Sequence, residues 1–251
     1  MSNNVIDITN LSGGYEDKQV LEGLSLNIKQ GGFTAIAGPN GAGKSTILKY
    51  LIKELKTKNN TIEIFNTDIN ALKQKELAHY ISFQGQSAFR NEEFTVYQVV
   101  ALGRYSYNDV ENCSSKVIKA LETTGIIHLK DKLITKISGG EFQLTMLART
   151  ICQEANILAL DEPANNLDPK HQLMLLNLLS NISKQGKTVL CVMHDLNAIL
   201  RYCDNCILVK DGKVFAQGET SKVLTQDNIK QVYQVDCRIL NDNETSYIVY
   251  N

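Results

Sequence analysis

The sequence predicts an α/β fold in which a helical subdomain is inserted into a strand-rich core. Three observations lead to this prediction. Strand patterns dominate the first part of the chain, up to about residue 88, and the apolar spacing then becomes helical up to about residue 153. Short apolar strands return at 156–163 and 187–195. A chain of 251 residues that is 43% hydrophobic can bury the sizeable core that such a fold needs.

The N-terminal part opens with strands. The segments "VIDI" (5–8) and "LSLNI" (24–28) alternate apolar and polar residues, which is typical of half-buried strands. "FTAIA" (33–37) is a short apolar run, which favours a buried strand, and a glycine-rich turn follows it. The segment "STILKYLIKEL" (45–55) then has helical spacing. Strand, glycine turn and helix in this order are the opening of a βα unit.

The rest of the chain is predicted to be helical first and mixed afterwards. The expected elements are helices over 95–105, 114–126, 141–153 and 169–186 and strands over 156–163 and 187–195. Asp211-Gly212 lies between two apolar runs and predicts a β-hairpin.

We expect one domain over 1–251, because no internal repeat or low-complexity linker divides it. Within it the core is expected at about 1–88 and 155–220 and the helical subdomain at about 89–154. The polar tail at about 221–251 is too short for a separate regulatory domain.

Composition excludes several classes of function. The net charge is −1 and the pI about 6.4, so no global basic field attracts nucleic acid, and no nucleic-acid partner is expected. The first ten residues lack the basic and apolar regions of a signal peptide. No apolar run approaches the ~20 residues that a membrane span requires. If the protein works at a membrane, another chain must cross it.

The six cysteines are scattered, and we interpret them as reduced thiols of a cytosolic protein. Cys203 and Cys206 form a C-x-x-C pair. No second pair and no nearby histidine completes a zinc site, so two semi-buried small residues at a helix end are favoured over metal or redox chemistry.

The segment "GPNGAGKST" fits the phosphate-binding pattern G-x-x-x-x-G-K-[ST] in full. Glycines allow a tight turn whose backbone N–H groups point at phosphate oxygens, and the helix that follows adds its positive end. In this pattern Lys44 reaches the β- and γ-phosphates, and Ser45 offers its hydroxyl to Mg²⁺. The candidate phosphate-binding residues are Gly38, Pro39, Asn40, Gly41, Ala42, Gly43, Lys44, Ser45 and Thr46.

Two acids follow the apolar run "ILAL". Asp161, at the end of the predicted strand, is placed to orient Mg²⁺ directly or through water. Glu162 faces another direction and is the candidate for acting on the attacking water. His194 ends the other apolar strand and should reach the same sheet edge, because ligands of open α/β sheets bind there. His79, His128 and His171 lack such a context and are expected to be structural or exposed.

The stretch "KISGGEFQ" (136–143) precedes a helical pattern. Ser138 and Glu141 form the S-x-x-E of a capping box, so a helix N-terminus is expected here. Ordinary capping does not require Gly139-Gly140, and a helix start without side chains admits an anion closely.

Together these motifs, in this order, resemble the nucleotide-binding subunit of ATP-binding cassette (ABC) transporters. "ISGGE" is similar to the family signature LSGGQ, with Ile137 for Leu and Glu141 for Gln, while Phe142 stands where a basic residue is common. The resemblance covers nearly the whole chain. It implies a P-loop NTPase (RecA-like) core, an N-terminal antiparallel β subdomain, an inserted α-helical subdomain and an active ATPase that uses ATP and Mg²⁺.

The resemblance also implies roles for further residues. Tyr15 matches the aromatic residue that stacks on adenine, and His194 matches the switch histidine that holds the γ-phosphate. Asp168, in "ANNLD", is the acid of the D-loop, with Ala164 where Thr is common. Gln86 matches the Q-loop glutamine, which contacts Mg²⁺.

The Q-loop assignment depends on the alignment of one short segment. Matching Tyr-x-Pro-Gln with Phe83-Gln84-Gly85-Gln86 selects Gln86 over Gln84, although Gly85 replaces the usual proline.

In the family each ATP lies between the phosphate loop of one subunit and the signature of the other. The resemblance therefore implies that Ser138, Gly139, Gly140 and Glu141 act on the partner's nucleotide in a head-to-tail homodimer. The implied location is peripheral, on the cytoplasmic face of the membrane, against integral membrane permease subunits. An extracytoplasmic substrate-binding protein would take part indirectly.

The segment 95–107 is similar to the corresponding stretch of iron-siderophore, haem and cobalamin importers, which favours import of a metal chelate. The segment "SAFRNEE" (87–93) suits an exposed docking surface. A zinc/manganese importer ATPase and a soluble ABC ATPase, such as an iron–sulfur cluster assembly factor, remain alternatives. The sequence does not identify the ligand, because in this family the binding protein and permease select it.

Overall fold

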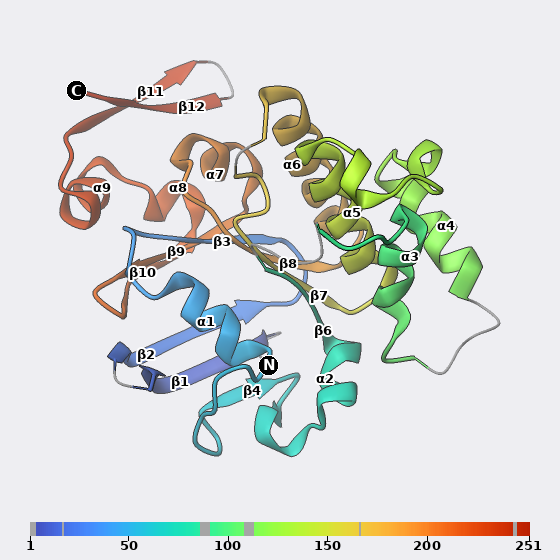
Figure 1. The fold of residues 1–251 in the computed structure, drawn as a ribbon. Helices are drawn as coiled ribbons and strands as arrows, with labels where there is room; N and C mark the ends of the chain where they lie inside the picture. The colour runs from blue at the N-terminus through green and yellow to red at the C-terminus, as the bar shows by residue number, and fades with distance from the viewer. Residues whose placement is uncertain (1–3, 17, 86–90, 108–112, 166, 243–244) are drawn as a thin grey trace.

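The centre of the molecule is a six-stranded sheet with the strand order β10-β9-β3-β8-β7-β6 (Figure 1). The computed structural model describes residues 4–16, 18–85, 91–107, 113–165, 167–242 and 245–251. The strands of this sheet are β3 Phe33–Ala37, β6 Ile81–Gln84, β7 Ile157–Asp161, β8 Thr188–Val192, β9 Asn205–Lys210 and β10 Lys213–Glu219. All neighbouring pairs are parallel except β9 and β10, which are antiparallel.

The central strands are buried on both faces because alternate residues enter different cores. Along β3, Ile36 joins one hydrophobic cluster, whereas Ala35 and Ala37 join the other. The first face is covered by helix α1 (Lys44–Leu51) and by a second sheet, and the opposite face by helices of the second half of the chain. This explains why "FTAIA" reads as a continuous apolar run.

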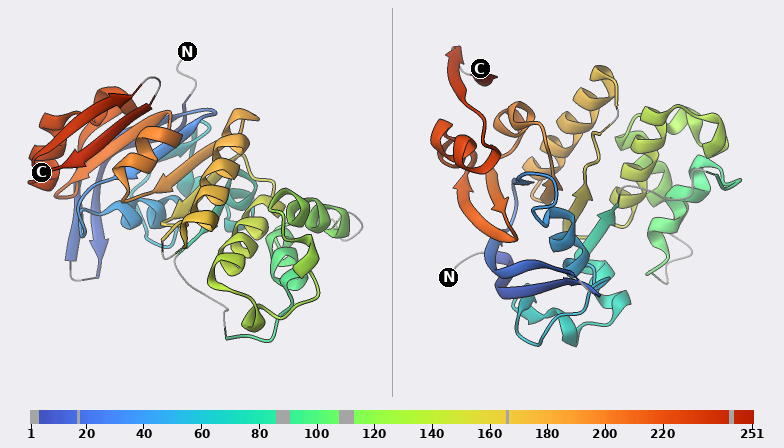
Figure 2. Two further views of the ribbon diagram at one scale, coloured as in Figure 1. Left: turned by 90° about the horizontal axis from the view of Figure 1, so that it is seen from above. Right: turned by 60° about the vertical axis from the view of Figure 1, so that its left-hand side comes forward.

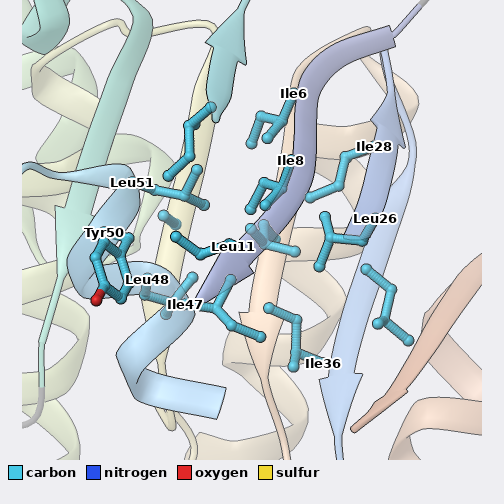
Figure 3. Packing of buried hydrophobic residues seen from close by; sticks show 14 of the residues in the cluster. Ile6, Ile8, Leu11, Leu26, Ile28, Ile36, Ile47, Leu48, Tyr50 and Leu51 are labelled. Carbon is cyan, nitrogen blue, oxygen red and sulfur yellow. The ribbon is translucent and has the colours of Figure 1, made fainter. Parts of the chain in front are cut away.

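The second sheet is antiparallel, with the strand order β2-β1-β4-β5. Its strands are β1 Asn4–Tyr15, β2 Lys18–Lys29, β4 Ile62–Ile64 and β5 Thr67–Asp68, followed by η1 Ile69–Ala71 and α2 Gln74–Tyr80. Figure 3 shows its apolar side chains, among them Ile6 and Leu26, pointing toward Ile47 and Leu51 of α1 and Ile36 of β3. The predicted antiparallel β subdomain is thereby confirmed, and its apolar face packs against α1.

A helical subdomain lies beyond β6, at one edge of the central sheet (Figures 1 and 2). Its elements are α3 Val96–Ala101, η2 Leu102–Arg104, α4 Cys113–Thr123, η3 Ile127–Leu129, η4 Ile134–Lys136 and α5 Gly139–Cys152. These helices bury a third cluster of their own, which includes Val99, Leu121 and Leu144. The inserted helical subdomain predicted from the change of periodicity is therefore present.

The remaining chain completes the second face of the sheet. Its elements are α6 Pro169–Lys184, α7 Leu196–Tyr202, α8 Thr220–Val223, α9 Gln226–Tyr233, β11 Cys237–Asp242 and β12 Thr245–Tyr250. The predicted hairpin forms between β9 and β10, with Asp211 and Gly212 at positive φ (48° and 73°). The polar tail is more regular than its composition suggests, because Ile229, Val232 and Ile248 pack into the cluster below them.

The cysteines contribute to packing. All six are free thiols, and Cys203 and Cys206 are buried in the cluster under α7 and α9. Burial raises the pKa of the Cys206 thiol to about 12. Within the described ranges, no helix is both long and apolar enough to cross a membrane.

Candidate active site

The glycine-rich turn between β3 and α1 is held tightly by its own chain. Gly38 has φ 151°, and a Cβ there would lie 2.1 Å from the Val209 carbonyl oxygen. Gly43, the N-cap of α1, has φ 100°, and its Cβ would lie 2.5 Å from Leu21 Cδ2. Only glycine fits at these two positions, since strain and close contact both exclude a side chain. The sequence spacing therefore places a backbone loop at the positive end of α1.

Lys44 bends back over this loop. Its Nζ donates hydrogen bonds to the carbonyls of Gly38 (2.8 Å) and Pro39 (2.9 Å). Burial lowers the pKa of the ammonium, whereas the carboxylates of Glu162 and Asp161 oppose that shift. The ammonium thus lies between the loop carbonyls and two acids, where it can pair with an anion.

A cleft of about 370 Å³ opens at this loop. It is lined by Tyr15, Lys18, Val20, Asn40, Gly41, Gly43, Lys44, Ser45, Thr46 and Glu162. The predicted adenine-stacking residue Tyr15 is 45% exposed, and Lys49 Nζ lies 5.2 Å from the centre of its ring. The sequence analysis did not predict Lys18 and Val20 in this lining. Both belong to β2, and this strand has no sequence motif that marks it as part of a site.

Ser45 and Asp161 form a direct pair across the end of the sheet. The Ser45 hydroxyl donates to Asp161 Oδ1 at 2.9 Å. Burial raises the pKa of the Asp161 carboxyl, and the hydrogen bond from Ser45 counteracts the rise. No group of three or more His, Cys, Asp or Glu side chains among the described residues is arranged to hold a metal. A hydroxyl and one carboxylate suit Mg²⁺, which keeps waters and phosphate oxygens as its other ligands.

Glu162 turns away from Asp161, as expected. Its backbone has φ 52°, and its N–H donates to the Val192 carbonyl at 3.2 Å. A non-glycine residue in this region is uncommon and marks a turn that the surroundings enforce. The carboxylate is hydrogen-bonded to His194 Nε2 and accepts from Asn165 Nδ2.

The structure therefore brings both candidate catalytic residues, Glu162 and His194, into contact. Asn165, which the sequence analysis did not single out, also donates to the Glu162 carboxylate.

The stretch 138–141 is the capping box that the sequence predicts. Ser138 Oγ accepts from the Glu141 N–H at 3.2 Å, and the Glu141 carboxylate accepts from the Ser138 N–H at 2.7 Å. These bonds from Ser138 hold the pKa of Glu141 below its usual value. The capping box therefore closes the first turn of α5 with residues of that turn.

The two glycines in this turn have different surroundings. A Cβ on Gly139 would meet no atom of the described residues within 4 Å, and Gly139 is exposed. A Cβ on the buried Gly140 would lie 2.5 Å from His171 Cγ. Gly140 is explained by packing inside the chain, whereas Gly139 is not.

His171 belongs to the N-terminus of α6, whose N-cap is Asp168. Asp168 Oδ1 accepts from the His171 N–H at 3.1 Å, and Oδ2 is 2.6 Å from His171 Nδ1. The hydrogen bonds from His171 lower the pKa of the Asp168 carboxyl. His171 was expected to be structural or exposed, and it is a packing residue that joins the candidate D-loop to the candidate signature turn.

The Q-loop candidate Gln86 lies outside the described residues. Its rejected alternative, Gln84, is the buried last residue of β6, where Nε2 donates to Gln143 Oε1 at 2.9 Å. Phe142, an unusual residue after the signature, is buried in the helical cluster. Its apolar side chain therefore contributes to subdomain packing.

Comparison with known proteins agrees with this geometry. Residues 21–165 match the model of the family described as ABC transporter. The chain is 37% identical to the ferric enterobactin transport ATP-binding protein of Escherichia coli (strain K12), over 92% of this chain and 88% of that protein. It is 34% identical to the iron(3+)-hydroxamate import ATP-binding protein of Bacillus subtilis (strain 168), over 97% and 93% of the two chains.

A solved structure shows the same fold. It is an inward-facing transporter assigned to the metal-chelate ABC type, which superposes with a TM-score of 0.85 over 99% of this chain and 97% of that one, at 24% identity.

Proposed function

Because the chain belongs to the ABC transporter family, we propose that it is the ATP-hydrolysing subunit of a membrane importer for an iron-siderophore or related metal chelate, such as haem or cobalamin. The observation that carries the substrate class is the similarity, over nearly the whole chain, to two ATP-binding proteins named for iron-chelate transport. The ATPase itself is the family's activity, and the phosphate loop, the acids and the signature supply its parts.

The nucleotide is bound by groups with distinct tasks. The loop N–H groups and the N-terminus of α1 attract the phosphates, and Lys44 exchanges the carbonyls of Gly38 and Pro39 for phosphate oxygens. Tyr15, half exposed at the cleft, offers its ring to the adenine. These groups position the substrate and neutralise its charge.

Ser45 and Asp161 are the residues that would hold Mg²⁺. The ion, when bound, would supply positive charge to the phosphate oxygens. Asp161 and Lys44 are both buried, so the site is poorly solvated. In such a place the positive charge of the ion would interact strongly with the phosphate oxygens.

Glu162 is the group that receives the proton of the attacking water or orients that water. Its φ of 52° turns the carboxylate out of the β7 strand direction, and the carboxylate lines the cleft. His194 and Asn165 both hold the carboxylate, so its orientation is set before substrate binds. When Glu162 releases His194, the imidazole is placed to donate a hydrogen bond to the γ-phosphate.

The signature turn acts on a nucleotide outside its own chain. Gly139 is exposed, and although the Glu141 N–H donates to Ser138 Oγ, the N–H groups of Gly139 and Gly140 at the start of α5 remain for an anion. We therefore place Ser138, Gly139, Gly140 and Glu141 against the γ-phosphate bound by a second copy, in a head-to-tail homodimer with two shared sites.

An apolar groove in the helical subdomain is the proposed contact with the permease. It has a volume of about 440 Å³ and is lined by Phe94, Tyr97, Gln98, Ala101, Leu102, Arg104, Tyr105, Tyr107 and Cys113. Tyr105 is 90% exposed and Leu102 40%. Exposed aromatic and apolar residues around a hollow suit a helix of a membrane subunit that reaches the cytoplasmic face.

The catalytic assignment is tested with Glu162→Gln. The variant keeps the shape and one hydrogen bond to His194 but loses the proton acceptor, so steady-state ATP hydrolysis with Mg²⁺ should fall at least about 100-fold while ATP binding is retained. Hydrolysis at the wild-type rate would contradict the assignment.

The docking assignment is tested with Tyr105→Asp. Co-expressed with an iron-siderophore permease, this variant should fail to co-purify with it, whereas a charge at Phe215, 37% exposed on β10, should not interfere. Equal recovery of both variants would contradict the proposed groove.

A further inference from the structure

A buried glutamine connects the edge of the central sheet to the signature helix. Gln84 is 1% exposed and ends β6, the edge strand next to the helical subdomain. Its Nε2 donates to Gln143 Oε1 at 2.9 Å, and its own Oε1 is buried without a donor among the described residues. A buried amide with one unpaired end costs stability compared with an apolar side chain of the same shape. The chain therefore keeps a polar group where an apolar one would be more stable.

The opposite end of helix α5 is tied to the first residue of the same strand and to helix α2 before it. Gln153, the C-cap of α5, donates through Nε2 to the backbone carbonyls of Ala78 (2.7 Å) and Ile81 (2.9 Å). The start of β6 is thus bound to the end of α5, and the end of β6 is bound to the second turn of α5. The helix and the strand run antiparallel and are joined at both ends.

The contacts at the two ends of α5 differ in the number of hydrogen bonds and in how freely their groups can rotate. At the Gln153 end one side chain holds two acceptors that are fixed in the backbone. At the other end, two side chains with rotatable bonds share one hydrogen bond. Gln143 lies four residues after Gly139, so it is on the same face of the helix and moves with the signature turn.

We propose that Gln84 is a positioning residue, which sets the direction of the signature turn relative to the ATP-binding core through its bond to Gln143. The proposal rests on the function proposed for the signature turn. The Gln153 end acts as the fixed point of α5, and the Gln84–Gln143 bond fixes the angle at the free end. The buried Oε1 of Gln84 provides an acceptor that lets the amide pair differently when this angle changes.

Hydrogen exchange tests the contact without reference to hydrolysis. In Gln84→Met, whose side chain has a similar volume, the backbone amides of residues 142–146 should exchange about five- to tenfold faster than in the wild type. Amides near Gln153 should be unchanged. Equal exchange at 142–146 would overturn the proposal.

Kinetics test the consequence. Gln84→Met and Gln143→Met should each lower kcat about five- to tenfold, and the double variant should be no worse than either, because both remove one bond. The dissociation constant for ATP should stay within about twofold of the wild type, since neither residue lines the phosphate loop cleft. Gln217→Met, which loses a bond from β10 to the Asn27 carbonyl, is the matched control and should keep the wild-type kcat.

The outcomes separate this inference from the proposed function. An inactive wild-type protein would contradict the ATPase and leave the exchange test standing. An active wild type whose Gln84 and Gln143 variants have unchanged kcat, or losses that add, would contradict the positioning role alone.

Discussion

The phosphate loop and the signature turn are both glycine-rich helix N-termini, yet the chain surrounds only the first of them. Around the loop, Val209 and Leu21 press on Gly38 and Gly43, and a cleft of about 370 Å³ opens beside α1. Around the signature turn, the capping box is satisfied internally but Gly139 faces open space. The phosphate loop is therefore enclosed by its own chain, whereas the signature turn presents an exposed glycine outward.

This difference gives each glycine a separate explanation. Glycine in a helix costs about 0.5–1 kcal/mol relative to alanine, so its presence calls for a compensating contact. At Gly140 the close approach of the His171 ring is that contact. At Gly139 the described part of the chain offers none, and the proposed phosphate of a second subunit fills this role.

The largest expected effect is that of Gly139→Asp. A carboxylate at this position repels the γ-phosphate across the interface, so hydrolysis should fall at least about 100-fold. ATP binding to the monomer, measured by equilibrium titration, should stay within about twofold of the wild type because the phosphate loop is untouched. A large loss of monomer binding would show that the two regions share one site within the chain.

A smaller effect should separate Gly140 from Gly139. Gly140→Ala places a methyl group against His171 and should lower the free energy of unfolding by about 1–3 kcal/mol. Gly139→Ala meets nothing and should leave it unchanged or raise it slightly. Chemical denaturation measures both.

The packing explanation has its own check. His171→Ala combined with Gly140→Ala should recover most of the loss, because the clash is then absent. A double variant as unstable as the sum of the two single variants would contradict it.

The smallest effect concerns the pH dependence of the capping box. Hydrogen bonds from Ser138 depress the pKa of Glu141, so the stabilisation is present above the usual value of about 4.5 and is lost as pH falls through the depressed value. Glu141 is half-buried at the surface, where solvent still screens its charge, so Glu141→Gln should lower the free energy of unfolding by less than about 1 kcal/mol at pH 7. Denaturation curves at pH 7 and below pH 4 should show this difference shrinking, and a constant difference would contradict the charge effect.

Local chemistry allowed much of this molecule to be predicted. "FTAIA" became β3 without change of bounds, the capping box formed at Ser138, and Asp211-Gly212 turned the hairpin. Each depends on residues adjacent in sequence. The fold class followed because apolar periodicity changes where the helical subdomain begins.

Contacts between distant segments could not be predicted in the same way. His171 had no motif, and its role arises because α6 brings its ring onto Gly140 of α5. Gln84 was considered only as an alternative to Gln86, whereas its partner Gln143 is 59 residues away in the sequence. Contacts of this kind join residues far apart in the chain and leave no recognisable pattern in a single sequence.

The central claim is that each nucleotide site combines the phosphate loop of one chain with the signature turn of another. Mixing Lys44→Ala protein with Gly139→Asp protein tests it most directly, because each chain alone has one damaged half in every site. In a head-to-tail pair that contains one of each, one site joins two intact halves. With random pairing, about a quarter of the wild-type ATP hydrolysis should therefore return. A mixture no more active than its separate components would contradict the account.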